Sequence, residues 1–208
     1  MTTQARGSGV ADVPWPCELR GLVDAVDLAV HDAVAATATP RLDRLLVGVS
    51  NAANYSRVWL VTAAAVAVVG GGRGRRAARG GVLSIALTSA LTNMVLKPLA
   101  RRQRPHEHPG PDSRRVRRPV SPSFPSGHAA SAFAFAAAMG RAEPGLWLPL
   151  HVAAATVAYS RVHTGVHYPS DVVVGAAIGN LCGGVVRRLS VHLAARPRRG
   201  GDRDGQRR

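Results

Sequence analysis

Residues 160–186 have the sequence SRVHTGVHYPSDVVVGAAIGNLCGGVV. In this stretch a short polar connection joins two apolar runs, and it contains Arg161, His167 and Asp171. Apolar runs rich in Ala and Gly are typical of helices that pack closely against one another. The stretch therefore predicts a helical bundle with these three polar side chains at one of its ends.

Five apolar runs of this kind follow one another along the chain. They are residues 58–70, 82–96, 127–139, 145–159 and 171–186, each 13–16 residues long. A membrane-spanning helix needs about 20 apolar residues, so each run would have to borrow flanking residues to span. Strand-like alternation of useful length is missing from the sequence. We therefore expect an all-α transmembrane bundle of five to six helices with the active site at one membrane face.

The segments outside these runs divide the chain. Residues 1–18 are expected to be a disordered lead, residues 19–186 the helical bundle, and residues 187–208 a basic disordered tail. Residues 19–38 carry three aspartates and a histidine among apolar residues, which favours an amphipathic or interfacial helix over a spanning one. Another short helix is expected over 41–54, and basic loops over 71–80 and 100–124.

The charge of the chain indicates the chemistry of its partner. The net charge of +15, from 27 basic and 12 acidic residues, predicts a partner rich in negative charge. A nucleic-acid partner is not expected, because the sequence has no nucleic-acid-binding motif and no interleaving of aromatic with basic residues. If all five runs span, the positive-inside rule favours the face that holds residues 71–80 as cytoplasmic. Residues 97–126 and 160–171 would then lie on the extracytoplasmic face.

Three motifs fall on that second face, each at the end of an apolar run. They are Lys97-x6-Arg104-Pro105, Pro125-Ser126-Gly127-His128 and Ser160-Arg161-x5-His167-x3-Asp171. Because helix ends on one side of a bundle can meet, we expect the three motifs to form one site.

The residue types of these motifs suit phosphoryl transfer, which needs positioning and neutralisation of charge on the phosphate oxygens. Lys97, Arg104 and Arg161 supply cations, and arginine binds phosphate oxygens with a planar fork. Ser126 and Gly127 stand where a helix begins, and backbone N–H groups at a helix start bind anions. We expect these five residues to bind phosphate.

The histidines are the candidates for covalent and proton-transfer steps. His167 is followed four residues later by Asp171, whose carboxylate could fix the tautomer of the ring and stabilise its positive charge. His167 is therefore the candidate nucleophile, and His128 the candidate general acid.

The three motifs together resemble the full signature of the type 2 phosphatidic acid phosphatase superfamily over residues 42–186, with no position departing from it. The resemblance implies a bundle of commonly six helices with an extracytoplasmic site. It also implies His167 as nucleophile, Asp171 as its partner, and His128 as acid, with no metal or organic cofactor. The expected function is hydrolysis of a phosphomonoester or diphosphate on a membrane lipid, of the polyprenyl phosphate or phosphatidic acid type. The chain resembles in particular the phosphatase half of bacterial proteins in which this domain precedes a lipid-kinase domain.

Several alternatives stay open at this point. The superfamily also contains soluble acid phosphatases and vanadate-binding haloperoxidases, and a non-catalytic lipid-phosphate binder is a further possibility. His163, His167 and Asp171 are spaced by four, as metal ligands on one helix face would be, although Gly165 and Pro169 argue against one unbroken helix. The remaining arginines of the long loop are expected to be solvated: Arg101, Arg102, Arg114, Arg115, Arg117 and Arg118. The substrate and the oligomeric state are not legible from the sequence.

Overall fold

The computed structural model describes residues 17–37, 39–106 and 114–195. All regular secondary structure within these residues is helical. Its main helices are α1 (Cys17–Ala36), α2 (Pro40–Ala52), α3 (Arg57–Val69), α4 (Gly71–Ala90), α5 (Lys97–Ala100), α6 (Gly127–Ala142), α7 (Trp147–His163) and α8 (Pro169–Ala195). Short turns η1 (Asn54–Ser56) and η4 (Pro144–Leu146) precede α3 and α7, and a π-helical turn η2 (Leu91–Leu96) joins α4 to α5. The all-α fold class is confirmed.

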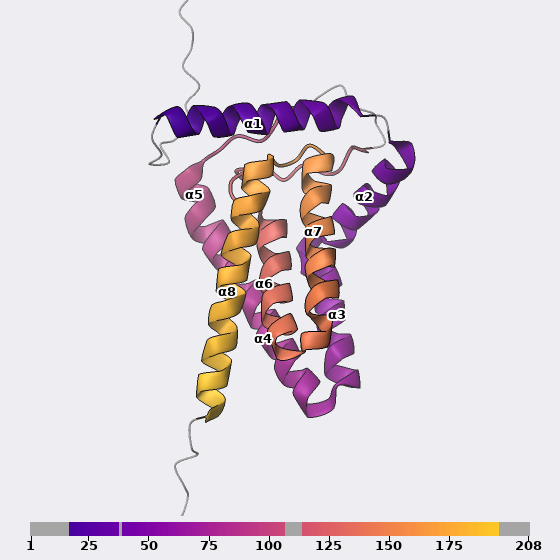
Figure 1. Cartoon of the computed structure of the whole chain (residues 1–208), viewed down its shortest axis with the longest axis vertical. Helices are drawn as coiled ribbons and strands as arrows, with labels where there is room; N and C mark the ends of the chain where they lie inside the picture. The colour runs from indigo at the N-terminus through magenta and orange to yellow at the C-terminus, as the bar shows by residue number, and fades with distance from the viewer. Residues whose placement is uncertain (1–16, 38, 107–113, 196–208) are drawn as a thin grey trace, which may run out of the picture.

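Helix α6 is the centre of the bundle, with α4, α7 and α8 packed against it (Figure 1). Its side chains from Ala129 to Ala138 are mostly alanine and almost wholly buried. Helix α8 approaches α6 closely because Gly179 and Gly183 face the α6 backbone. A Cβ atom there would lie 2.2 Å from the Ala130 oxygen and 2.4 Å from the Ala134 oxygen. Small residues thus set the distance between the two helices that carry His128 and Asp171.

Each of the five apolar runs falls mainly in one helix, α3, α4, α6, α7 or α8, and the run 82–96 continues from α4 through η2. The expectation of a basic loop over 71–80 is wrong, because these residues form the first half of α4. Arg and Ala are strong helix formers. The turn between α3 and α4 is confined to the start of this segment, at Gly71, whose φ is +54°. Gly74 then packs against α3, where a Cβ atom would lie 2.1 Å from the Val66 oxygen.

Two helices of the described chain are long and apolar enough to cross a membrane, Gly71–Ala100 and Pro169–Ala194. A third span is possible if Pro40–Ala52 and Asn54–Val69, which are bent by 62°, cross together. Helices α6 and α7 have 16 and 17 residues, shorter than a full span. The sequence already indicated this shortness, because the apolar runs 127–139 and 145–159 have only 13 and 15 residues.

Helix α1 lies across one end of the bundle, at a steep angle to α7 and α8 (Figure 1). Its apolar side chains face outward, with Leu22 61% and Val26 51% exposed, whereas Asp27 and His31 are buried. This inverted pattern agrees with the interfacial helix expected over 19–38.

At the other end of the chain, α8 continues to Ala195, beyond the boundary expected at residue 186. The disordered lead expected over 1–18 and the remainder of the basic tail, from residue 196, lie almost entirely outside the described residues.

Candidate active site

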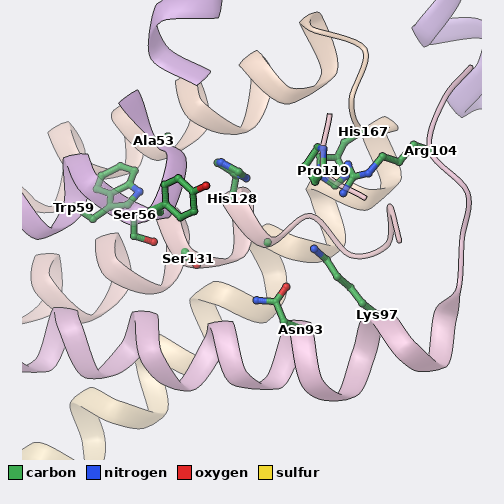
Figure 2. Close-up of a pocket in the computed structure, with 12 residues that line it drawn as sticks. Ala53, Ser56, Trp59, Asn93, Lys97, Arg104, Pro119, His128, Ser131 and His167 are labelled. Atoms are coloured by element: carbon green, nitrogen blue, oxygen red, sulfur yellow. Dashed lines mark hydrogen bonds between the residues drawn. The ribbon is translucent and has the colours of Figure 1, made fainter. Parts of the chain in front are cut away.

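The three motifs meet at the end of the bundle that α1 covers. Lys97 begins α5 and Arg104 follows it, His128 lies in the first turn of α6, and His167 lies between α7 and α8. These four side chains border one cavity of about 180 Å³ (Figure 2). The cavity is lined by Ala53, Tyr55, Ser56, Trp59, Asn93, Lys97, Arg104, Pro119, Gly127, His128, Ser131 and His167. The expected convergence of the motifs is therefore present in the structure.

The hydrogen bonds of His167 define which ring nitrogen carries its proton. Nδ1 lies 3.4 Å from Asp171 Oδ2 and 3.4 Å from Ser123 Oγ, and Nε2 lies 3.1 Å from Arg104 Nη1. A guanidinium can only donate, so Nε2 accepts that hydrogen bond and is the unprotonated nitrogen. Nδ1–H then donates to Asp171. Nε2 is therefore the acceptor nitrogen, and its lone pair meets Arg104, which lines the same cavity as His167.

The surroundings of His167 keep its ring neutral. Burial lowers the pKa of His167 to about 4, with the positive charges of Arg104 and Arg161 acting in the same direction and the hydrogen bond to Asp171 opposing them. A neutral imidazole at neutral pH is the form that can act as a nucleophile.

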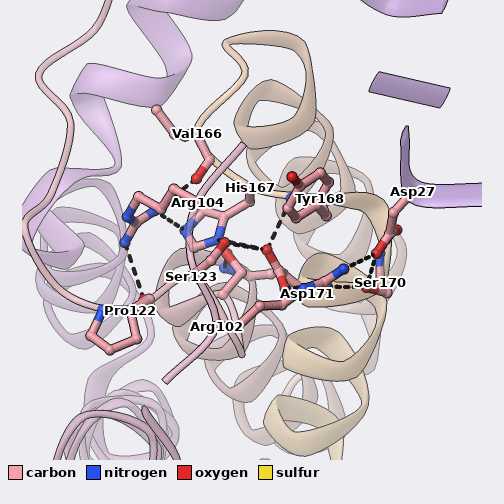
Figure 3. A network of polar contacts seen from close by, with 12 residues as sticks. Asp27, Arg102, Arg104, Pro122, Ser123, Val166, His167, Tyr168, Ser170 and Asp171 are labelled. Carbon is pink, nitrogen blue, oxygen red and sulfur yellow. Dashed lines mark hydrogen bonds and ion pairs between the residues drawn. The ribbon is translucent and has the colours of Figure 1, made fainter. Parts of the chain in front are cut away.

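Asp171 is fully buried at the start of α8 and held from several sides (Figure 3). Its Oδ2 accepts hydrogen bonds from the Tyr168 N–H, at 2.9 Å, and from the Ser123 hydroxyl. Its Oδ1 accepts a hydrogen bond from Arg102 Nη1 at 2.9 Å. These contacts leave the carboxylate little freedom to rotate away from His167.

The segment that precedes α6 fixes the two cations of the cavity. Arg104 donates to the Ser121 oxygen at 3.0 Å and to the Val166 oxygen at 2.7 Å, and Lys97 donates to Ser121 Oγ at 3.1 Å. Burial lowers the pKa of Arg104, although Asp171 partly offsets it and Arg118 adds to it. Two cations at one small cavity, with no acidic residue among the described residues that line it, make an environment suited to an anion.

Three of the eight residues expected at the site do not line the cavity: Ser126, Arg161 and Asp171. The Ser126 N–H is already occupied, since it donates to the Asp171 carbonyl at 2.9 Å, and its hydroxyl caps α6. Arg161 is 2% exposed and donates through Nη1 to the Ser50 hydroxyl. Gly127 does line the cavity, close to Lys97, whose Nζ would lie 3.7 Å from an added Cβ.

The sequence reasoning missed Asn54, for which it found no role. Asn54 Oδ1 lies 3.0 Å from His128 Nε2 and so orients the second histidine. Asn54 begins the turn between α2 and α3, where Tyr55 and Ser56 adopt left-handed φ values of 56° and 57°. Such backbone conformations in residues other than glycine concentrate at functional sites. No motif in the sequence signals this turn.

The expectation of a solvated loop is wrong for Arg102, Arg114 and Arg118. Arg102 binds Asp171, as described above, and Arg118 donates to the Pro105 and Gly165 carbonyls at 2.9 and 3.1 Å. Arg114 is 6% exposed and donates to Asp43 Oδ1 at 2.8 Å. Their acidic partners, Asp171 and Asp43, lie 69 and 71 positions away in the sequence, so the sequence offered no signal for these pairs.

The alternative in which His163, His167 and Asp171 share a helix face does not match the fold. His163 is the last residue of α7 and hydrogen-bonds Asp43. His167 lies in the connection between α7 and α8, and Asp171 lies in the first turn of α8. Within the residues that the structure describes, no group of three or more His, Cys, Asp or Glu side chains is placed to hold a metal ion.

Comparison with known proteins identifies the family of this site. The PAP2 superfamily matches residues 78–193, more than half of the chain. The chain belongs to the PAP2 superfamily, as the resemblance of its motifs implied.

Two curated relatives resemble the chain in sequence. A decaprenylphosphoryl-5-phosphoribose phosphatase from Mycobacterium tuberculosis is 50% identical over 93 residues, which is 45% of this chain and 50% of that protein. A lipid A 4'-phosphatase from Bacteroides thetaiotaomicron is 34% identical over 121 residues, 55% of this chain and 54% of that protein. The chain thus spans about half the length of the curated relatives it matches.

Two crystal structures share the fold. One is the transmembrane PAP2-type phosphatidylglycerolphosphate phosphatase from Bacillus subtilis, with a TM-score of 0.66 and 23% identity over 86% of this chain and 90% of that one. The other is LpxE from Aquifex aeolicus, with a TM-score of 0.64 and 26% identity over 77% of this chain and 94% of that one. These matches show that the chain shares the fold of both structures, and two of its described helices are long and apolar enough to cross a membrane.

Proposed function

We propose that this protein is a metal-independent lipid phosphatase that works through a phosphohistidine on His167. The observation that carries the proposal is a cavity lined by His167, His128, Lys97 and Arg104, in which Nε2 of His167 is unprotonated and accepts a hydrogen bond from Arg104. Membership of the PAP2 superfamily and the phosphatase names of both relatives support it.

In the first step, His167 Nε2 attacks phosphorus and the bond from phosphorus to the lipid oxygen breaks. His128 donates a proton to the departing oxygen, and Asp171 stabilises the positive charge that develops on the His167 ring. In the second step, His128 takes a proton from water as that water attacks phosphorus. The bond between phosphorus and Nε2 then breaks, which releases inorganic phosphate and restores the neutral ring.

Lys97, Arg104 and Gly127, which line the cavity, are proposed to bind the phosphate. Ser126 and Arg161, which do not line it, are proposed to join them when an entering phosphate displaces their present partners, Asp171 and Ser50. An entering phosphate would draw Arg104 away from Nε2, because its oxygens are stronger acceptors for a guanidinium than a neutral ring nitrogen. That exchange would free the lone pair of His167 only when a phosphate is present.

The substrate is proposed to be a phosphomonoester on a membrane lipid, with a polyprenyl-linked sugar phosphate as the first candidate. The relative with the highest identity of those described above is a decaprenylphosphoryl-5-phosphoribose phosphatase. Polyprenyl diphosphates and phosphatidic acid are the further candidates. The enzyme would be a multi-pass protein of the cell membrane, with its site on the extracytoplasmic face and α1 lying along the interface.

Phosphate release by the purified full chain in detergent tests the proposal. The panel holds a polyprenyl-linked sugar phosphate, a polyprenyl diphosphate and phosphatidic acid, each assayed with excess EDTA and with His167→Ala as control. We expect EDTA-resistant release with at least one lipid, and none from His167→Ala. Activity that disappears with EDTA and returns with zinc would refute the metal-free mechanism, and inactivity toward the whole panel would refute the substrate class.

A further inference from the structure

Arg102 connects the catalytic carboxylate to helix α1 without bordering the cavity. Its Nη1 donates to Asp171 Oδ1 at 2.9 Å and to Ser170 Oγ at 2.7 Å. Its Nη2 donates to Asp27 Oδ2 at 2.7 Å, and the guanidinium lies 4.5 Å from the centre of the Tyr168 ring (Figure 3). One planar group thus bridges two carboxylates that are 144 positions apart in the sequence.

Asp27 is 2% exposed and is the inward-facing acid of α1. Its Oδ1 accepts a hydrogen bond from the Ser170 N–H at 2.9 Å, and its Oδ2 accepts one from the Ser170 hydroxyl. Ser170 directly precedes Asp171, so Asp27 holds both Arg102 and the first turn of α8. A buried acid on an interfacial helix would be costly without such partners.

We infer that Asp27 and Arg102 form a strut by which α1 positions Asp171 against His167, so that α1 is part of the catalytic apparatus although it contributes nothing to the cavity. This inference rests on the proposed function of the site. Asp171 is held at Oδ1 by Arg102 and turns Oδ2 toward His167. Without the Arg102 contact the carboxylate could rotate. His167 would then no longer be held in the tautomer with its proton on Nδ1 and an unprotonated Nε2.

Charge gives the strut a second effect. Burial works against the charge of Arg102, but Asp171 and Asp27 outweigh it and raise the pKa of Arg102. Arg102 in turn neutralises part of the negative charge of Asp171. The carboxylate therefore stabilises a protonated His167 ring less, which favours a lower pKa for His167. The other charged or titratable groups that act on His167 are Arg104, Arg161 and, across the cavity, His128.

Four variants test the strut. Arg102→Gln should lower kcat about 100-fold, and Arg102→Lys nearly as much, because an ammonium cannot bridge both carboxylates as a fork does. Asp27→Asn should lower kcat about tenfold. The matched control is Asp24→Asn. Asp24 bonds the same Arg102 nitrogen at 2.9 Å, but its side chain is 52% exposed, so activity should change less than about twofold.

Two readouts separate positioning from general damage. Inhibition by vanadate, used as a phosphate mimic, should be unchanged in Arg102→Gln because Lys97 and Arg104 remain. The His167 imidazole, followed by NMR with ¹⁵N-labelled histidine, should titrate at higher pH in Arg102→Gln than in the wild type, because Asp171 then pairs more strongly with a protonated ring.

The outcomes distinguish the strut from the proposed function. A wild type that releases no phosphate from any lipid refutes the function, whereas the NMR titration tests the strut without turnover. An unchanged His167 titration in Arg102→Gln, an equal loss in Asp24→Asn and Asp27→Asn, or vanadate binding lost along with kcat would each overturn the strut.

Discussion

The described part of the chain contains two buried histidine–aspartate pairs whose histidines are four residues apart. His163 Nε2 lies 2.8 Å from Asp43 Oδ1, and His167 Nδ1 lies 3.4 Å from Asp171 Oδ2. Each aspartate also bonds an arginine of the long loop, Arg114 at Asp43 and Arg102 at Asp171. By pairing chemistry alone the two clusters could exchange roles.

The difference lies in what the second ring nitrogen meets. Nδ1 of His163 is buried and has no hydrogen-bond partner among the described residues, and His163 does not line the cavity. Nε2 of His167 meets Arg104, and both residues line the cavity. The closed cluster of His163, Asp43 and Arg114 therefore only links α2, α7 and the long loop. The open cluster of His167, Asp171 and Arg102 adjoins a cavity that an anion can enter. A histidine paired with an aspartate becomes a candidate nucleophile only when its other ring nitrogen is unprotonated and the residue lines a cavity that holds cations.

The largest expected effect separates the two rings directly. His167→Ala should lower kcat by at least about 10⁴-fold, because the covalent step loses its nucleophile. His163→Ala should keep kcat within about tenfold in the folded fraction and should lower the thermal midpoint instead. Phosphate release and melting in the same detergent measure both. Equal losses of kcat in the two variants would contradict the division between an open and a closed cluster.

Exchanging the carboxylates for amides sharpens the same contrast. Asp171→Asn should lower kcat about 10³- to 10⁴-fold, because an amide can stabilise the wrong tautomer of His167 and carries no charge for the ring. Asp43→Asn leaves Arg114 buried without its counter-charge, which should cost about 3–5 kcal/mol of stability.

The measurements are kcat and the free energy of unfolding for each variant. A fully active Asp171→Asn enzyme would remove Asp171 from the mechanism. An Asp43→Asn variant as stable as the wild type would show that the His163 cluster does not stabilise the fold.

The sequence could predict the open cluster and could not predict the closed one. His167 and Asp171 stand in one short segment at local spacing, and the ends of apolar runs bring Lys97, Arg104 and His128 to the same side. Helix count and local spacing are legible in a sequence. The partners Asp43 and Arg114 are 71 positions apart, and nothing in either neighbourhood indicates that the two meet.

Contacts between residues far apart in the sequence also explain which features of the fold could not be predicted. The apolar runs predicted a bundle of five to six helices, because continuous apolar runs rich in Ala and Gly are typical of closely packed helices. The glycines and arginines of residues 71–80 indicated a loop. Only the structure shows that Gly74 lets α4 pack closely against α3. Asp27 appeared as one of several acids on an amphipathic helix, and only the tertiary structure shows that it turns inward to Arg102.

The smallest expected effect is a shift in the titration of His167. Because its pKa is lowered to about 4, the ring should stay neutral down to that pH instead of protonating near 6.5. The unfolded chain binds this proton between about pH 6.5 and 4 while the folded chain does not, so acidification through that window should weaken folding. ¹⁵N histidine NMR in detergent gives the titration. Arg104→Gln should raise the pKa of His167, since a neighbouring cation is lost, whereas Arg114→Gln, a loop arginine of the closed cluster, should leave it in place. A midpoint near 6.5 in the wild type, or one that follows Arg114 instead of Arg104, would mean that the cationic cavity does not control the nucleophile.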